Sequence, residues 1–402
     1  MARLRTIRLC SSGVAVALLL SLAAVAAPAS KAATQNRRPC DIYAAAHTPC
    51  VAAFSSTRAL FAAFAGPLYQ VRRASDGRTR DIRVLEPGGY ANASAQDRFC
   101  ARTACVVDKI YDQTDNHNDL VPQGPTTAPY SNTYFAHDPV DAGALPIFAA
   151  GHQVYGLKFV DDSPTGLPCF TAATCVGSHG QAYNNGNRRA RGVAVNGQPE
   201  SAYGVFGGMF TGSQCCFDFG NSEIKGTDDG AGTMDAINFS RACWDACGPD
   251  GGPWVQADLE NGMFMTGQRT DYPENATAYL GGSFRAGDGF CCDATSRNLA
   301  MRHPFVTAVL ENPGSKTFAI KGAPASARDL TTFYSGTVPP GGYSPMRQEG
   351  AIILGSGGDQ GTTDGEFFEG AMTLGVPSAA AETAVQRDIA KVQYRMHRAR
   401  RG

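Results

Sequence analysis

Short runs of β-favouring residues alternate with turn signals along nearly the whole chain, which has 402 residues and 46 glycines. Runs of this kind, separated by frequent turns, are typical of antiparallel sheets that pack face to face. The sequence therefore predicts an all-β sandwich with long loops and little helix. We expect strands at residues 68–73, 81–85, 106–111, 202–209, 305–310, 317–320 and 351–354, the first two joined as a hairpin through residues 75–77.

Helical signals are sparse. Residues 57–64 have the composition of one short helix. Ser378 is a suitable N-cap for a terminal helix, because hydrophobic residues recur after it at helical spacing. These residues, expected on a single helix face, are Val385, Ile389, Val392 and Met396. Residues 122–146 lack apolar periodicity and are expected to form a long surface loop.

The first 33 residues have the pattern of a secretory signal peptide. Arg3, Arg5 and Arg8 precede an apolar stretch at residues 14–27, and small residues follow it. This stretch is short and alanine-rich, and no later segment approaches the ~20 apolar residues of a membrane span. We expect a secreted protein, extracellular or periplasmic, with residues 34–39 as a linker and residues 40–402 as a single domain.

The cysteine count supports an oxidising compartment. Removal of the signal peptide takes Cys10 from the 13 cysteines and leaves an even number, 13 − 1 = 12, suited to disulfides rather than to redox or zinc chemistry. Close spacing predicts three local bridges, Cys40–Cys50, Cys100–Cys105 and Cys169–Cys175. Three pairings are open to the four cysteines at positions 243, 247, 291 and 292.

Cys215 and Cys216 are adjacent in the chain. A bond between neighbours closes a strained eight-membered ring, and strain of this kind persists mainly at functional sites. Such a ring presents a rigid, flat and polarisable sulfur surface. The alternative is that each cysteine pairs elsewhere, and spacing alone does not decide between the two.

Charge excludes several classes of partner. The chain has 35 basic and 36 acidic residues, which are interspersed, so nothing indicates binding to nucleic acid or to a membrane. We expect a monomer without cofactor or metal. The acids at positions 218, 223, 228 and 229 are interpreted as loop residues, with a calcium site as the alternative.

Ten short motifs are spread over nearly the whole mature chain, at residues 40–43, 49–53, 56–60, 95–97, 99–105, 110–113, 215–221, 258–261, 343–346 and 349–359. Together they resemble the catalytic domain of fungal α-L-arabinofuranosidase B, glycoside hydrolase family 54, and keep the order and rough spacing of that family. Two departures from the family are expected: residues 272–303 look inserted, and the arabinose-binding module that follows in fungal members is not recognised.

The resemblance implies a concanavalin-like β-sandwich of the jelly-roll type that hydrolyses terminal α-L-arabinofuranosyl residues with retention. It also implies arabinose-containing polysaccharides, such as arabinan or arabinoxylan, as partners. Carried over motif by motif, Glu260 is the nucleophile and Asp359 the acid/base. The expected substrate-binding residues are a Cys215–Cys216 disulfide forming a wall of the sugar pocket, Asp258, Asn261, Gly358 and Trp244.

The residue types suit this chemistry even when the family resemblance is set aside. Retaining hydrolysis needs two carboxyl groups about 5–5.5 Å apart. On a strand, Asp258 and Glu260 project to one face while Leu259 enters the core. The glycines at positions 355, 357 and 358 let the main chain approach a ligand beside Asp359. Each pattern alone more often marks a solvated strand face or a turn.

Two other functions fit the same sandwich, because a fold does not dictate a function. One is a lectin-like module that binds carbohydrate without hydrolysis. The other is a hydrolase of a different sugar, such as a galactofuranoside or a β-xyloside. Release of the sugar from a panel of aryl glycosides discriminates among the three.

Overall fold

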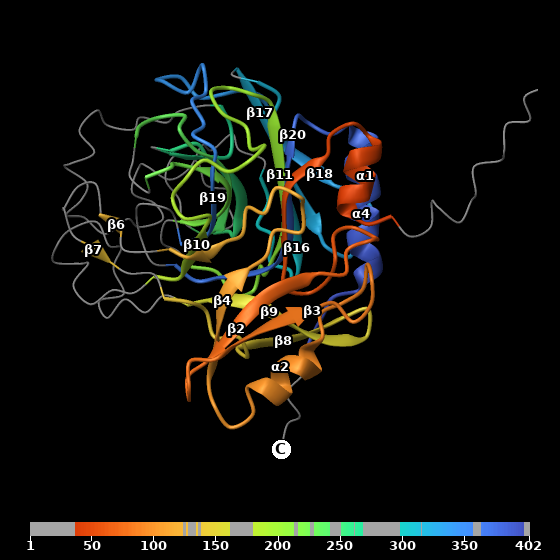
Figure 1. Cartoon of the computed structure of the whole chain (residues 1–402). Coiled ribbons are helices and arrows are strands. Elements are labelled where there is room, and N and C mark those ends of the chain that lie inside the picture. The colour runs from red at the N-terminus through yellow and green to blue at the C-terminus, as the bar shows by residue number, and fades with distance from the viewer. Residues whose placement is uncertain are drawn as a thin grey trace, which may run out of the picture. The chain divides into compact units, whose positions relative to one another are not determined.

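Two antiparallel β-sheets form the body of the protein in the computed structural model (Figure 1). The structure describes residues 37–123, 126–127, 134–135, 138–160, 180–212, 216–225, 229–241, 251–260, 262–267, 298–314, 316–356 and 363–397. The predicted all-β sandwich is confirmed. Residues 37–402 make up one unit, and no helix among the described residues is long and apolar enough to cross a membrane.

The larger sheet has nine strands. Its order is β18-β17-β16-β11-β20-β9-β8-β21, and β1 also pairs with β20. The long strand β20 pairs with β11 on one edge and with β9 and then β1 on the other. The strands are β1 (Cys50–Ser55), β8 (Leu145–Ala149), β9 (His152–Phe159), β11 (Glu200–Phe206), β16 (Val306–Asn312), β17 (Thr317–Pro324), β18 (Thr331–Thr337), β20 (Gly365–Leu374) and β21 (Arg395–Met396).

The second sheet has seven strands in the order β15-β14-β13-β12-β19-β10-β5. Its strands are β5 (Val121–Pro122), β10 (Ala182–Asn184), β12 (Phe217–Ser222), β13 (Asp235–Ser240), β14 (Trp254–Asp258), β15 (Met263–Phe264) and β19 (Ala351–Ser356). Two smaller sheets are β3-β2-β4 and β6-β7. These contain β2 (Pro67–Arg73), β3 (Thr79–Arg83), β4 (Cys105–Ile110), β6 (Thr126–Thr127) and β7 (Tyr134–Phe135).

Aromatic side chains fill the space between the two large sheets. Phe206 lies 5.3 Å from Phe239, and Phe219 lies 5.2 Å from Phe367, measured between ring centroids. Glycine makes room for them, because a Cβ atom on Gly365 would lie 2.4 Å from the Phe217 ring. The interior is packed closely enough that one added carbon has no space.

Three helices are described: α1 (Pro39–Ala45), α2 (Ala93–Phe99) and α4 (Ala379–Val392). Figure 1 shows α1 and α4 side by side. The ring centroid of Tyr43, on α1, lies 6.0 Å from that of Tyr203, on β11. The predicted Ser378 cap is confirmed, since its Oγ accepts from the Ala381 N–H at 3.3 Å. Met396 was wrongly placed on this helix, which ends at Val392 and is followed by β21.

The predicted helix at residues 57–64 is wrong. These residues form bends and a turn instead. The Ser55 Oγ accepts hydrogen bonds from the N–H groups of Thr57 and Arg58, both at 3.0 Å, and so replaces helical bonding with a local turn. Helices α1 and α2 were not predicted from the sequence. Helix α2 begins at an N-cap, where the Asn92 Oδ1 accepts from the Ala95 N–H at 3.1 Å.

A buried ion cluster fixes this turn against β20 and α4. The Arg58 guanidinium donates to Glu369 Oε1 at 2.7 Å and to Asp388 Oδ2 at 2.6 Å. The side chains of Arg58 and Glu369 are fully buried. Burial lowers the pKa of Arg58, but the two carboxylates outweigh it, so the pKa is raised well above its ordinary value and the ion pair persists.

We expect Arg58→Met to lower the free energy of unfolding by about 3–5 kcal/mol, because it leaves two buried carboxylates without their cation. The matched control is Arg387→Met. Arg387 pairs with Asp329 at 3.1 Å on the surface, where such a pair contributes about 0–1 kcal/mol. Urea unfolding of both variants measures the difference, and equal losses would contradict the structural role of the cluster.

Two carboxylic acids, Glu200 on β11 and Asp235 on β13, are buried close to each other. Burial raises the pKa of Asp235 to about 6. Burial, and then the charge of Asp235, raises the pKa of Glu200 well above its ordinary value. A raised pKa in the folded state means that the folded protein binds the proton more tightly than the unfolded chain does. Protonation of Asp235 therefore stabilises the folded state fully below about pH 4, and this stabilisation is lost as the pH rises to about 6.

We expect Asp235→Asn to remove much of this pH dependence, because the amide resembles the protonated acid. Between pH 4 and pH 7, the stability of the variant relative to the wild type should rise by on the order of 2–3 kcal/mol. Urea unfolding at several pH values measures it. Asp329→Asn, at an exposed position, is the control and should show no such trend. A constant difference between Asp235→Asn and wild type would refute the shifted pKa.

Candidate active site

Strands β12, β13 and β14 have one apolar and one polar face. Phe217 and Phe219 on β12, and Ile237 and Phe239 on β13, belong to the core cluster between the sheets. The residues that alternate with them project to the opposite face. This opposite face carries polar side chains that are nonetheless buried: Asp218, Asn238, Ser240, Gln256 and Asp258.

Hydrogen bonds hold this polar row in place. The Asn238 Nδ2 donates to Asp218 Oδ1 at 2.7 Å, and the Ser240 Oγ donates to Asn238 Oδ1 at 2.7 Å. Asp218 lies opposite Asn238 on one neighbouring strand and opposite Gly355 on the other. The carboxylate of Asp218 is therefore fixed on β12, the central strand of the seven-stranded sheet.

Cys216, Asp218 and Asp258 converge on one point. The Cys216 sulfur and a carboxylate oxygen of each aspartate all lie within 4.8 Å of one another, and the three residues are buried. Cys216 is disulfide-bonded, so its sulfur is not a thiolate and the group lacks the ligands of a zinc site. What remains is a sulfur surface beside two carboxylates, a combination that suits the apolar edge and the hydroxyl groups of a sugar.

Glu260 is placed by a turn rather than by a strand. Strand β14 ends at Asp258, and Glu260 adopts a left-handed backbone conformation with φ +62°. The Glu260 N–H donates to Asp258 Oδ1 at 3.0 Å. The Leu259 carbonyl accepts from the Gly232 N–H at 2.7 Å. A non-glycine residue at positive φ costs on the order of 1–3 kcal/mol, and such strain concentrates at functional sites.

The strand-alternation hypothesis for residues 258–260 is thus confirmed in part. Leu259 is fully buried in the core, as expected. Glu260, however, lies beyond the end of the strand. The Asp258 side chain accepts a hydrogen bond from the Glu260 N–H, and this local bond replaces strand pairing. The two acids are still adjacent, and both are about 5% exposed.

Several predicted residues lie outside the described residues. They are Cys215, Trp244, Asn261, Gly358 and Asp359, together with the cysteines at positions 169, 175, 243, 247, 291 and 292. The register describes the strand that precedes residues 358 and 359 in the chain. Strand β19 ends at Ser356, which lies opposite Phe217, the residue after Cys216. Gly355 has φ +114°, in agreement with the unusual backbone expected there.

Asp218 was missed by the sequence analysis, which took it for a loop acid. It is fully buried on β12. The signal that identifies it is the alternation Phe217-Asp218-Phe219, which places one acid between two core aromatics on a strand. Of the predicted disulfides, Cys40–Cys50 and Cys100–Cys105 are present, with Cα–Cα distances of 5.5 and 5.8 Å.

Comparison with known proteins agrees with this geometry. The family profile described as "Alpha-L-arabinofuranosidase B, catalytic" matches residues 39–281 and 281–395. The chain is 41% identical over 368 residues to Alpha-L-arabinofuranosidase B of Emericella nidulans, and 40% identical over 360 residues to the probable enzyme of Aspergillus fumigatus. Both alignments cover 89% of this chain, and the chain spans 62% of the length of each relative.

Solved structures give the same result. One is a GH54 α-L-arabinofuranosidase soaked with a cyclic sulfate inhibitor, and another is an arabinofuranosidase complexed with arabinofuranosyl-α-1,2-xylobiose. Each has a TM-score of 0.74 and 37% sequence identity, and each match covers 90% of this chain and 66% of the other. The chain belongs to the family of α-L-arabinofuranosidase B catalytic domains, glycoside hydrolase family 54.

The partner of Cys216 can be tested directly. The four other described cysteines bond to each other in pairs, so Cys216 has its partner elsewhere. We expect that partner to be Cys215. Peptide mapping under non-reducing conditions should recover both in one peptide, intact and unalkylated. Recovery of Cys216 linked to a distant cysteine would exclude the adjacent bond.

Proposed function

We propose that this protein is a secreted, retaining, exo-acting α-L-arabinofuranosidase that removes terminal arabinofuranosyl residues from arabinan- or arabinoxylan-type polysaccharides. The observation that carries the proposal is the convergence of the Cys216 sulfur with the carboxylates of Asp218 and Asp258. The Asp258 carboxylate also accepts a hydrogen bond from the N–H of Glu260. Family membership supports it. The signal-like first 33 residues and the two disulfides support export.

In this proposal Glu260 is the nucleophile. Its carboxylate attacks the anomeric carbon while Asp359 donates a proton to the departing glycosidic oxygen, which gives a covalent arabinosyl-enzyme. Asp359 then takes a proton from water, and that water releases the sugar with retained configuration. The left-handed turn at Glu260 supports this role, because backbone strain of this kind concentrates at functional sites and Asp258 holds the Glu260 backbone through its N–H.

The remaining residues shape the pocket. Asp258, Asn261 and the backbone at Gly358 hold arabinose hydroxyls, and Trp244 together with a Cys215–Cys216 disulfide covers the apolar edge of the ring. Asp218 lies within the same group of atoms as Asp258, so we add it to the sugar-binding residues. We expect the protein to act as a monomer without cofactor.

A lectin-like module or a hydrolase of another sugar predicts a different result with aryl glycosides. The proposed enzyme releases 4-nitrophenol from the α-L-arabinofuranoside and leaves the β-D-galactofuranoside and β-D-xyloside intact. Another relative is a Glu-to-Gln mutant of a GH54 α-L-arabinofuranosidase soaked with 4-nitrophenyl α-L-arabinofuranoside, which makes this glycoside a suitable first substrate. No release from any of the three would favour the lectin-like alternative.

Substitution separates the two carboxyl roles. We expect Glu260→Gln to be nearly inactive on every substrate, since no covalent intermediate can form. Asp359→Asn should lose most activity on natural glycosides but retain the first step with an aryl leaving group, which needs no proton. Added azide should then restore turnover and give an arabinosyl azide of retained configuration.

The control is Glu86→Gln, an exposed glutamate, which should have wild-type activity. Thermal unfolding of each variant checks that it is folded. Equal losses for Glu260→Gln and Asp359→Asn on both kinds of substrate, without azide rescue, would remove the role of Asp359. A first product of inverted configuration would rule out the retaining mechanism.

A further inference from the structure

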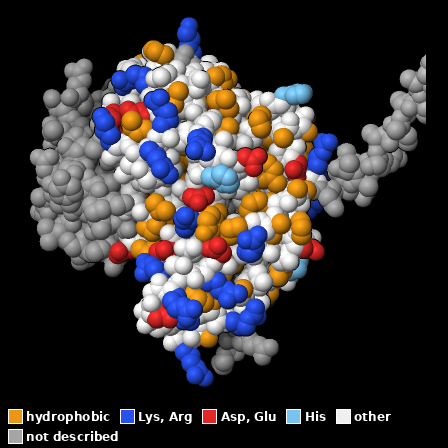
Figure 2. Space-filling view, in the orientation of Figure 1, with side chains coloured by type: hydrophobic (Ala, Val, Ile, Leu, Met, Phe, Trp, Pro, Cys, Tyr) orange, Lys and Arg blue, Asp and Glu red, His pale blue; other side chains and the backbone are white. Residues whose placement is uncertain are grey.

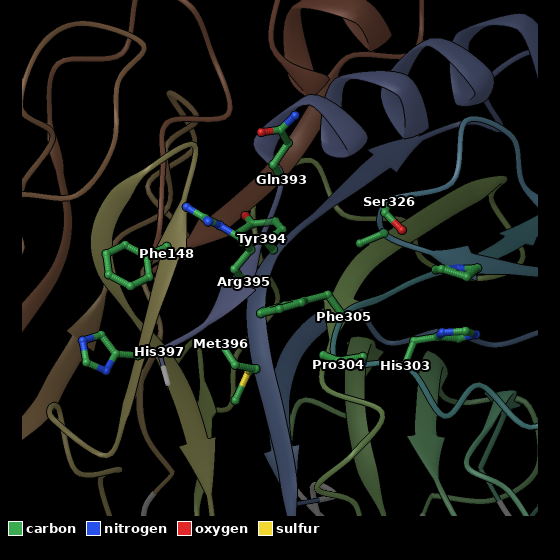
Figure 3. Close-up of a pocket in the computed structure, with 12 residues that line it drawn as sticks. Phe148, His303, Pro304, Phe305, Ser326, Gln393, Tyr394, Arg395, Met396 and His397 are labelled. Carbon is green, nitrogen blue, oxygen red and sulfur yellow. The ribbon is translucent and has the colours of Figure 1, made fainter. Parts of the chain in front are cut away.

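A pocket of about 890 Å³ lies between strands β8 and β21 and the residues next to β16 and β17 (Figure 3). Strands β8 and β21 contribute to one side of it. Residues just before β16 and at the end of β17 contribute to the other. None of the described active-site residues, Cys216, Asp218, Asp258 and Glu260, lines this pocket. It is lined by Phe148, His303, Pro304, Phe305, Pro324, Ala325, Ser326, Gln393, Tyr394, Arg395, Met396 and His397.

Aromatic rings form two walls of the pocket. Phe148 stacks on His397, with ring centroids 5.3 Å apart and planes at 17°. Phe305 stacks on Tyr394 at 5.2 Å and 21°. Figure 3 shows Phe148 and His397 at one side of the pocket and Phe305 towards the other, with Arg395 between them. Phe305 is buried and Phe148 is half-buried, so the Phe148 ring is the flat surface open to the apolar face of a sugar ring.

The Tyr394 wall is anchored in the interior. Its hydroxyl donates to Glu369 Oε2 at 2.6 Å and lies 2.9 Å from the Thr57 Oγ1. Burial, followed by the charge of Glu369, raises the pKa of Tyr394 well above its ordinary value, so the hydroxyl keeps its proton for this bond. The ring is therefore positioned before any ligand arrives, which lowers the entropic cost of binding.

Arg395 is the one charged side chain among the described lining residues of the pocket, and two imidazoles, of His303 and His397, lie in the same lining. All three residues are exposed, and none of the described lining residues is an acid. Among the described residues Arg395 has no ion pair, and its guanidinium lies 5.8 Å from the centre of the Phe148 ring. The chain as a whole has a formal charge of −1, so this concentration of basic groups does not reflect a generally basic protein.

We propose that this pocket binds an acidic saccharide, with the carboxylate of a uronic acid residue on Arg395 and the sugar ring against Phe148. A planar guanidinium matches a carboxylate through two parallel hydrogen bonds. The aromatic walls distinguish this ligand from a small inorganic anion, and the basic groups distinguish it from a neutral sugar. The volume lies within the range of about 300–1,000 Å³ that is usual for ligand sites, so it holds a short oligosaccharide rather than a single ion.

An acidic saccharide can bind this pocket whether or not the protein is a hydrolase. Only the advantage of that binding for hydrolysis rests on the proposed function. A polysaccharide that carries both arabinofuranosyl and uronic acid residues would be held at two places on one protein, and linked sites gain avidity without new contacts. The pocket therefore specifies a subclass of the proposed substrates, namely those with acidic side groups.

Isothermal titration calorimetry tests the site with a xylo-oligosaccharide that bears one glucuronic acid residue, compared with the unsubstituted oligosaccharide of equal length. Neither contains arabinose, so the wild-type protein is used without turnover. We expect the acidic ligand to bind at least tenfold more tightly than the neutral one. Arg395→Gln should weaken its binding at least tenfold, and Phe148→Ala should weaken it several-fold.

Arg80→Gln is the matched control for charge. Figure 2 shows basic side chains gathered over the lower part of the visible face, where Figure 1 places β2 and β3, and Arg80 is exposed on β3. This variant loses the same charge without touching an aromatic pocket, so its affinity should be unchanged. An equal loss in Arg80→Gln and Arg395→Gln would show diffuse attraction and overturn the site.

Other outcomes also decide the proposal. Equal affinity for the acidic and neutral oligosaccharides, or no binding of either, refutes it. Complete competition by sodium phosphate at a concentration similar to that of the sugar would indicate a simple anion site. Hydrolysis of 4-nitrophenyl α-L-arabinofuranoside should be the same in Arg395→Gln and wild type. A protein that binds the acidic sugar but releases no 4-nitrophenol would keep this pocket and refute only the proposed function.

Discussion

The close approach of the two large sheets is the constraint on which the site depends. Phenylalanine side chains of β12 and β13 fill the interior, and glycine in β20 makes room for them. Because side chains alternate along a strand, every residue committed to this core sends its neighbours to the other face. Asp218 lies between Phe217 and Phe219, so the packing that holds the sandwich together also fixes the carboxylate.

The buried Arg58 cluster has a comparable role for the other sheet. It joins the segment after β1 to β20 and α4, which are more than 300 residues away in the chain. Glu369 bonds both Arg58 and the Tyr394 hydroxyl, so one carboxylate connects the cluster to the aromatic wall of the pocket. Burying charge is costly, and an apolar replacement of the whole cluster is often as stable. The cluster therefore contributes mainly by fixing the position of the chain after α4, through the bond between Glu369 and Tyr394.

Local signals in the sequence were sufficient for some elements. The hairpin of β2 and β3 follows from its turn residues, and the start of α4 follows from a serine cap before an apolar stripe. Both depend on residues a few positions apart. The sequence also placed Leu259 in the core and paired the cysteines that are close in the chain.

Long-range interactions explain what the sequence analysis got wrong. Residues 57–64 have helical composition, but Arg58 meets its two carboxylate partners only in the folded protein, and Ser55 bonds the chain into a turn. Asp218 was interpreted as a loop acid because an isolated aspartate is usually exposed. Its alternation with Phe217 and Phe219 indicates a strand, and the pairing of that strand on both sides buries the carboxylate. In both cases tertiary contacts override local propensity.

The turn at Glu260 shows how the strand end and the site are connected. Asp258 is the last residue of β14 and uses one carboxylate oxygen to accept the Glu260 N–H. A carboxylate has about four acceptor positions, so one such side chain can accept several hydrogen bonds at once. The same side chain therefore ends the strand, stabilises a backbone conformation that glutamate rarely adopts, and lies beside Cys216 and Asp218. Replacing Asp258 would disturb the position of Glu260 as well as any direct contact with a sugar, so its contribution to binding cannot be separated from its contribution to that turn by a single substitution.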